Sequence, residues 1–368
     1  MTNPEYRTAI RHVIYLAGCA VNGNKPDIHK LTDMDPEEVY KAASFHHLSA
    51  VVGMALENTG LQTPEFRKAV ARSRMICLQF DHHRTAVLAE LERAGIWYMP
   101  LKGVILKEYY PGFGMREMGD NDILFDADRA KDVRQIMTGL GFEIEKYNTG
   151  THDVYCKPPA CIFEMHRTLL LYLENTEAVS YYRNIKERLL KDPDNKYGYH
   201  FSDEDFYIYM TVHEYKHYSR LGTGLRSLLD TYVYLRDRKL DWNYISSELK
   251  SLKLSGFEKT NRELALSLFT GQLPDAEQQK MLEQILTDGT YGTVNAGVDR
   301  QISVKGKLCY FFSRLTLPRE IMLADFPILK KLPFLYPVFW IIRLFRGLFF
   351  RREKALIEIR SLLRKRDE

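Results

Sequence analysis

One short segment, residues 118–125, constrains the fold of this chain more than any other, because it joins two charged side chains to an apolar run. Asp120 and Asp122 are separated by one residue, and residues 123–125 are all apolar. Alternate side chains of a β-strand share a face, so the two carboxylates should point to one side and Asn121 to the other. Mg²⁺ prefers one or two carboxylates together with substrate phosphates. The segment therefore predicts a strand that carries a phosphate-handling metal site.

Length, charge and cysteine usage limit the class of protein. The chain has 368 residues, of which 45% are hydrophobic, so it can bury large cores and is expected to form two or three domains. A formal net charge of +4 does not indicate a nucleic-acid partner. The five cysteines form no CxxC pair, which argues against a disulfide framework and a cysteine-ligated zinc. Since the first residues also lack the pattern of a secretory signal, we expect a cytoplasmic protein.

The spacing of apolar residues divides the chain into three regions. Residues 1–95 and 173–368 show the spacings of three and four that are typical of helices. Residues 96–172 instead alternate between strand and helix patterns. Within them we predict helices at 104–110 and 127–140, and strands at 96–101, 120–125, 142–147, 153–157 and 161–166. The expected fold is α+β, with a small mixed-sheet core between N-terminal and C-terminal helical domains.

Further polar residues are expected near the Asp120 strand. Lys102 and Gly103 form a turn that opens a helix. Glu164 and His166 lie two residues apart on a predicted strand and so share a face. Together with Arg116, these residues provide carboxylates, cations and a glycine turn, which are the groups that nucleotidyl transfer requires. We expect His166 to be a packed residue rather than a metal ligand, since zinc would need further histidines or cysteines nearby.

The same residues match the pattern of a known family. The chain resembles the bacterial uncharacterised nucleotidyltransferases of the polymerase-β-like superfamily, which carry a Leu-Lys-Gly turn, a downstream arginine and an Asp-x-Asp-hydrophobic strand. Here these elements are residues 101–103, Arg116 and residues 120–124.

The likeness extends beyond this segment, over roughly residues 40–350. Residues 164–166 resemble the third acidic strand of the family. A His-x-x-Lys-His helix at 213–217 and a Leu-Arg-x-Leu-x-Asp segment at 225–230 resemble later parts of it. Only residues 98–125 carry a specific pattern, because many helical proteins could show the rest.

The resemblance implies that a nucleoside monophosphate moves from a nucleoside triphosphate, such as ATP, to a hydroxyl group of a small molecule, sugar or protein, with Mg²⁺ or Mn²⁺ as cofactor. It implies that the catalytic residues, which also bind the metal, are Asp120, Asp122 and Glu164. It implies that the nucleotide contacts Lys102, Gly103 and Arg116. A candidate acceptor pocket would contain His166, His213, His217, Arg226 and Asp230.

One departure from the superfamily pattern motivates a different function. The superfamily has a second small residue after the glycine of its first turn, whereas Val104 follows Gly103 here. The alternative is a catalytically degenerate protein that binds a nucleotide or a partner without turnover.

A second motif points to a different class of enzyme. Residues 213–217 match H-E-x-x-H, in which two histidines one turn apart bind zinc and the glutamate activates water. The extended form of that motif needs a glycine and a third histidine, but Arg220 and Thr223 occupy those positions. A zinc metalloprotease is therefore a lesser alternative. The histidines could instead be structural, facing the α/β region and hydrogen-bonding Asp230 or the backbone.

The C-terminal region contains a strongly apolar run at residues 332–350. Pro333, Pro337 and Arg343 interrupt this run, so we do not expect it to cross a membrane. The helical spacing predicts an amphipathic basic helix at 338–354. Such a helix would either dock on the protein itself or make peripheral contact with an anionic membrane.

Overall fold

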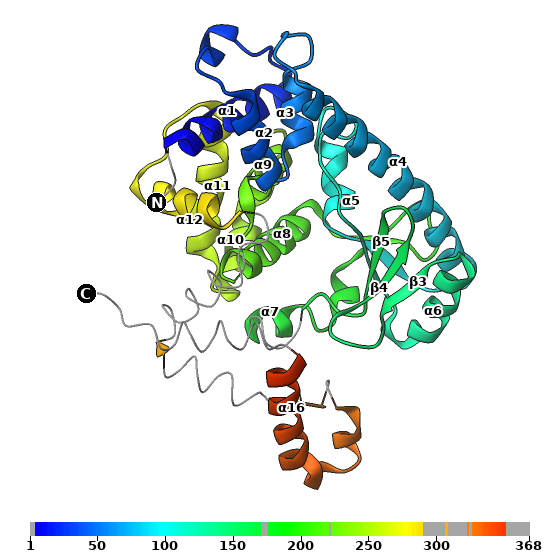
Figure 1. Ribbon diagram of the computed structural model, residues 1–368. Coiled ribbons are helices and arrows are strands. Elements are labelled where there is room, and N and C mark those ends of the chain that lie inside the picture. The colour runs from blue at the N-terminus through cyan, green and yellow to red at the C-terminus, as the bar shows by residue number, and fades with distance from the viewer. Residues whose placement is uncertain are drawn as a thin grey trace.

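The computed structural model describes residues 4–170, 176–220, 222–289, 306–307, 322–323 and 326–350. The fold has a helical part and a part built around a five-stranded sheet (Figure 1). The predicted α+β class is confirmed.

The helical part joins two regions that are far apart in the sequence. Val13 of the first helix, Val51, Leu228 and Ile285 all lie in one buried hydrophobic cluster. Figure 1 accordingly shows the blue N-terminal helices beside the yellow helices near residue 270. The helices that contribute to this core are α1 (Pro4–Val21), α2 (Pro36–Phe45), α3 (Ser49–Ala55), α9 (Gly224–Leu235), α11 (Ser255–Thr270) and α12 (Ala276–Asp288). The N-terminal and C-terminal helical regions therefore share a core.

The long helix α4 (Pro64–Arg93) connects the two parts of the fold, and it lies in the region 1–95, whose apolar spacing predicted helices. Phe66, near its start, packs in the helical core, whereas Phe80 and Val87 pack in a second core beneath the sheet. Figure 1 shows α4 running along the outside of the sheet.

The sheet is mixed, with strand order β1-β2-β5-β4-β3. β2 pairs in parallel with β5, and the other three pairings are antiparallel. Pro100 lies on edge strand β1, as expected for a residue that cannot donate to a ladder. The strands are β1 (Tyr98–Pro100), β2 (Asn121–Phe125), β3 (Glu143–Lys146), β4 (His152–Lys157) and β5 (Cys161–His166).

Helices cover the two faces of the sheet. Ile123 and Phe125 of β2 pack in the core that includes α4 and α6 (Ala130–Gly139). Leu124 points to the opposite face, where it packs in a core with α8 (Asp203–Tyr218) and α10 (Trp242–Ser251). The remaining elements of these parts are η1 (Ile28–Leu31), α5 (Gly103–Leu106), η2 (Lys107–Tyr109), η3 (Ala127–Arg129), α7 (Thr176–Tyr181) and η4 (Ile185–Arg188).

A small hairpin between α7 and α8 was not predicted. β6 (Leu190–Lys191) and β7 (Tyr199–His200) form a two-stranded sheet, and the neighbouring Gly198 forms an isolated bridge with Tyr98 of β1. Residues 173–368 show a helical pattern in the sequence, and this hairpin departs from it. Strands of two residues are too short to show an alternation of polar and apolar side chains.

The predicted C-terminal helix is present as α16 (Tyr336–Phe350), which follows η5 (Pro327–Lys330) and η6 (Pro333–Leu335). Residues 351–354 of the predicted segment lie outside the described residues. Val338, Ile341 and Phe345 of α16 are exposed. Among the described residues, no helix combines the length and the apolar character that a membrane span requires.

The contact between α3 and α4 depends on a glycine. A Cβ atom on Gly53 would lie 2.8 Å from a methyl group of Val70 and 3.1 Å from the carbonyl oxygen of Phe66. We expect Gly53→Ala to lower the free energy of unfolding by about 1–3 kcal/mol through overpacking, measured by urea denaturation. In α11, a Cβ atom on Gly256 meets nothing within 4 Å, so the control Gly256→Ala should be neutral or stabilising by up to about 1 kcal/mol. Equal effects of both substitutions would contradict this account.

Candidate active site

Three carboxylates converge at one end of the parallel strand pair. Asp122 of β2 lies in register with Glu164 of β5, and Asp120 immediately precedes β2. Ligand oxygens of these three residues all lie within 4.8 Å of one another. Asp122 is buried, whereas Asp120 and Glu164 are half-buried. The structure thus brings together the three carboxylates that the sequence placed on neighbouring strands.

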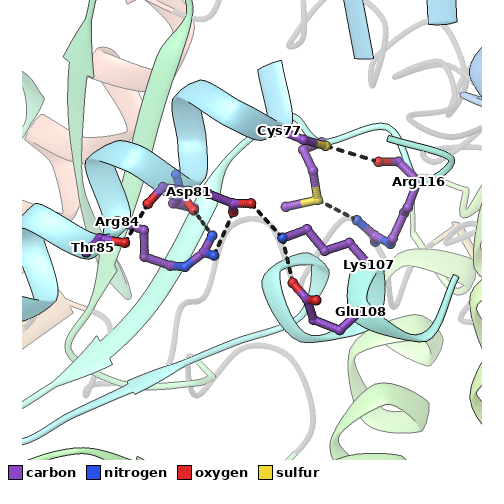
Figure 2. A network of polar contacts seen from close by, with 9 residues as sticks. Cys77, Asp81, Arg84, Thr85, Lys107, Glu108 and Arg116 are labelled. Atoms are coloured by element: carbon purple, nitrogen blue, oxygen red, sulfur yellow. Dashed lines mark hydrogen bonds and ion pairs between the residues drawn. The ribbon is translucent and has the colours of Figure 1, made fainter. Parts of the chain in front are cut away.

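The opposite face of β2 is held by a polar network from α4. Arg84 donates to the side-chain oxygen of Asn121 at 3.2 Å and to Asp81 at 2.6 Å. Figure 2 shows Asp81 between Arg84 and Lys107. The ammonium of Lys107 lies 2.9 Å from Oδ2 of Asp81 and also donates to Glu108. Because Asn121 is fixed toward α4, the alternation of the strand directs Asp122 to the other face.

Lys102 supplies the positive charge nearest to the carboxylates. Its Nζ lies 2.6 Å from Oδ1 of Asp122. The residue has φ 49° and ψ −119°, a conformation that is strained for a side chain other than glycine and that clusters at functional sites. Burial lowers the pKa of Lys102, but the negative charges of Asp122 and Asp120 and the hydrogen bond to Asp122 act together with Tyr209 to raise the pKa above its usual value. Lys102 is therefore protonated.

His166 is the second partner of Asp122. Its Nε2 lies 2.6 Å from Oδ1 of Asp122 and 3.4 Å from Oε2 of Glu164. Burial raises the pKa of Asp122, but Lys102 and His166 lower it to a net value far below its usual range. Since an ionised carboxylate only accepts hydrogen bonds, Nε2 of His166 donates to Asp122.

The negative charge on Asp122 raises the pKa of the neighbouring Asp120. Together with burial, this charge raises that pKa to about 6. Two carboxylates this close resist ionising together. A divalent cation would relieve this repulsion, so the donor set fits a hard metal ion.

The raised pKa of Asp120 has a consequence for stability. A raised pKa means that the folded state favours the protonated form, so the free energy of unfolding falls as the pH rises from about 4 to about 6. We expect Asp120→Asn to raise the free energy of unfolding at pH 8 by about 1 kcal/mol, a value reduced to allow for the partial exposure of Asp120. The gain should disappear at pH 4 and below. Urea denaturation at both pH values would measure this gain, with the exposed Asp128→Asn as control. A loss of stability of Asp120→Asn at pH 8 would contradict the prediction.

The structure adds a histidine that the sequence reasoning missed. His152 of β4 lies directly opposite His166 in the antiparallel register. Its Nε2 lies 3.6 Å from Oε1 of Glu164, and its Nδ1 is 3.0 Å from the hydroxyl of Thr151. The predicted strand at 153–157 began one residue too late to include His152. Only the register between the two strands could have placed this residue.

Arg116 ties the sheet region to α9. Its Nε and Nη2 donate to the two oxygens of Asp230 at 2.8 and 2.9 Å, and both side chains are buried. Tyr110 donates to the same carboxylate at 2.7 Å. A Cβ atom on Gly103 would lie only 2.5 Å from Nη1 of Arg116. The glycine of the turn is therefore required by the packing of Arg116.

A cavity of about 340 Å³ lies between the carboxylates and helices α8 and α9. Near the turn it is lined by Lys102, Gly103 and Leu106. Val104 packs instead in the core with Met118 and Ile123. The predicted site residues that contribute to the wall of the cavity are Lys102, Gly103, Arg116, Asp120, Asp122, Glu164, His166, His213, His217, Arg226 and Asp230.

The two histidines of α8 contact each other across one helical turn. The Nε2 atoms of His213 and His217 are 3.2 Å apart. Burial lowers the pKa of His217 to about 4 and that of His213 well below its usual value. The alternative that they hydrogen-bond Asp230 receives no support, because that carboxylate accepts from Tyr110 and Arg116.

The H-E-x-x-H motif does not assemble a metal site within the described part of the chain. There, the groups of three converging ligand side chains are Asp120, Asp122, Glu164 and His152, Glu164, His166. Neither group includes a histidine of α8. Glu214 is buried and accepts a hydrogen bond from Asn261 at 2.9 Å. The zinc metalloprotease alternative is therefore not supported.

Comparison with known proteins gives one match. A family model described as uncharacterised nucleotidyltransferase matches residues 32–270 of the chain. Neither the curated proteins nor the solved structures contain a match.

Proposed function

Since this chain belongs to the uncharacterised nucleotidyltransferase family, we propose that it transfers a nucleoside monophosphate from a nucleoside triphosphate to a hydroxyl acceptor, with Mg²⁺ or Mn²⁺ as cofactor. The observation that carries the proposal is the convergence of Asp120, Asp122 and Glu164 beside a cavity. These three residues would hold the metal and act as the catalytic residues. The acceptor would be a small molecule, a sugar or a protein.

Each group of the site has a role in this reaction. When bound, a divalent cation neutralises the charge that develops on the phosphates. Lys102 would contact the departing pyrophosphate, because its ammonium is already positioned next to Asp122. His166 would hold Asp122 in its ionised form and in one orientation. The reaction then depends mainly on position and on charge.

The remaining predicted residues would shape the two substrate positions. Gly103 and Arg116 would contribute to the nucleotide side of the cavity. Arg116 would act there mainly through its pair with Asp230, because its Nε and Nη2 already donate to that carboxylate. The acceptor would bind against α8 and α9, where the cavity wall includes His213, His217 and Arg226.

The alternative of a degenerate protein that binds without turnover rests on Val104. This side chain lies in the hydrophobic core and leaves the cavity wall to its neighbours in the turn. The departure from the superfamily pattern therefore supplies no steric obstacle to a nucleotide. Catalysis remains the proposal that we favour.

Nucleotide binding tests the proposal most directly. Calorimetry would measure the binding of ATP, GTP, CTP and UTP to the purified protein, with Mg²⁺ or with a chelator. We expect one or more nucleotides to bind only in the presence of the metal. If no nucleotide bound under either condition, the proposed function would be wrong.

Two statements about location remain predictions. A cytoplasmic location rests on cysteine usage. A peripheral membrane contact through residues 338–354 is supported by the exposed apolar side chains Val338, Ile341 and Phe345 of α16.

A further inference from the structure

We propose that His152, His166 and Glu164 form a second metal position beside the carboxylates, suited to a divalent transition-metal ion. The inference rests on the proposed function, because it concerns the same catalytic centre. It adds to the metal position of the three carboxylates a neighbouring position of different chemistry.

The geometry of the sheet brings these residues together. Glu164 and His166 are two residues apart on β5 and therefore share a face. His152 lies opposite His166 on the neighbouring strand β4. The ligand atoms of the three residues lie within 4.8 Å of one another, and the two imidazole rings are 4.9 Å apart. All three side chains line the cavity.

The two oxygens of Glu164 face different histidines. Oε1 lies 3.6 Å from Nε2 of His152, and Oε2 lies 3.4 Å from Nε2 of His166. Nε2 of His152 lies beside one of these oxygens, and Nε2 of His166, which donates to Asp122 in this structure, would release that proton on binding a metal. Glu164 also belongs to the carboxylate group with Asp120 and Asp122. A single carboxylate is therefore shared by two adjacent ligand sets.

The surroundings of His152 resemble those of a metal ligand. Its Nδ1 interacts with the hydroxyl of Thr151 at 3.0 Å, which leaves Nε2 directed toward Glu164. Metal-ligating histidines usually make such a hydrogen bond through the other ring nitrogen, because it fixes the tautomer and the ring orientation.

The donor types of the two sets differ. Carboxylate oxygens suit both Mg²⁺ and Mn²⁺, whereas an imidazole nitrogen suits a transition metal such as Mn²⁺ better than it suits the hard Mg²⁺. The set with two histidines and one carboxylate should therefore retain a transition-metal ion when Mg²⁺ is in excess. The set with three carboxylates should not discriminate in this way.

Pulsed electron paramagnetic resonance of bound Mn²⁺ tests the proposal, because it detects nitrogen nuclei in direct coordination. The full-length protein would be loaded with Mn²⁺ in the presence of excess Mg²⁺. We expect nitrogen couplings in the wild type and a weaker or absent coupling in His152→Asn. The Mn²⁺ affinity of this variant should fall by at least about 10-fold, the loss that even outer partners of metal ligands cause.

A matched control separates coordination from general effects on the cavity. His213 also lines the cavity but belongs to neither ligand set, so His213→Asn should keep the nitrogen couplings of the wild type. Bound Mn²⁺ without nitrogen coupling in the wild type would overturn the proposed histidine position and leave the proposed function intact. Nitrogen couplings that are unchanged in His152→Asn would likewise overturn the proposed histidine position and leave the proposed function intact. Failure to bind any Mn²⁺ would overturn both.

Discussion

Replacing Asp122 by asparagine should lower the rate of nucleotidyl transfer by at least about 100-fold, the loss caused by removal of one well-placed electrostatic group. Asp122 is the buried centre of the charge cluster, in contact with Lys102 and His166. Asparagine keeps the volume of the side chain and one acceptor oxygen but removes the charge. The rate would be measured as release of pyrophosphate from the nucleotide that binds the wild type.

The control for this substitution is Asp128→Asn, which makes the same change of charge at an exposed position of η3. It should leave the rate within about twofold, as expected for a surface substitution away from the site. A fully active Asp122→Asn variant would contradict the assignment of the catalytic centre. Circular dichroism and urea denaturation would show whether each variant is folded.

Removing the Arg116 side chain should lower the free energy of unfolding by about 3–5 kcal/mol, because it leaves a buried carboxylate without its cation. Arg116 and Asp230 are 9% and 6% exposed and are joined by two hydrogen bonds. The pair also connects the sheet region to helix α9 of the helical core. Urea denaturation of Arg116→Ala would measure the effect.

Two comparisons identify the cause of that loss. The double variant Arg116→Ala/Asp230→Ala should be more stable than Arg116→Ala alone, since the unpaired buried charge is removed. Arg93→Ala breaks an ion pair whose arginine side chain is 70% exposed, and should cost no more than about 1 kcal/mol. If Arg116→Ala proved as mild as Arg93→Ala, the buried pair would not be a major tie between the two parts of the fold.

Local patterns in the sequence were sufficient to predict most of the helices and strands and to identify the three carboxylates. Asp120 and Asp122 could be assigned to one side of a strand because side chains alternate there with a period of two. The strand predicted at 96–101 is present as β1, in which Pro100 suits an edge position because proline has no N–H group to donate. The spacing of three and four likewise identified as helical the region 1–95, which contains α4. Each of these inferences depends only on neighbouring residues.

Only the tertiary structure decided which distant residues meet. The register of β4 against β5 places His152 opposite His166, and a shift of one residue would turn His152 to the other face of the sheet. The bond between Arg116 and Asp230 spans 114 positions, and the helical core joins residues as distant as Ala9 and Ile285. Such contacts depend on how whole elements pack, and no local periodicity encodes that. The sequence by itself therefore determined the strands of the five-stranded sheet and the carboxylates, whereas packing determined the histidine partners, the buried ion pair and the cavity.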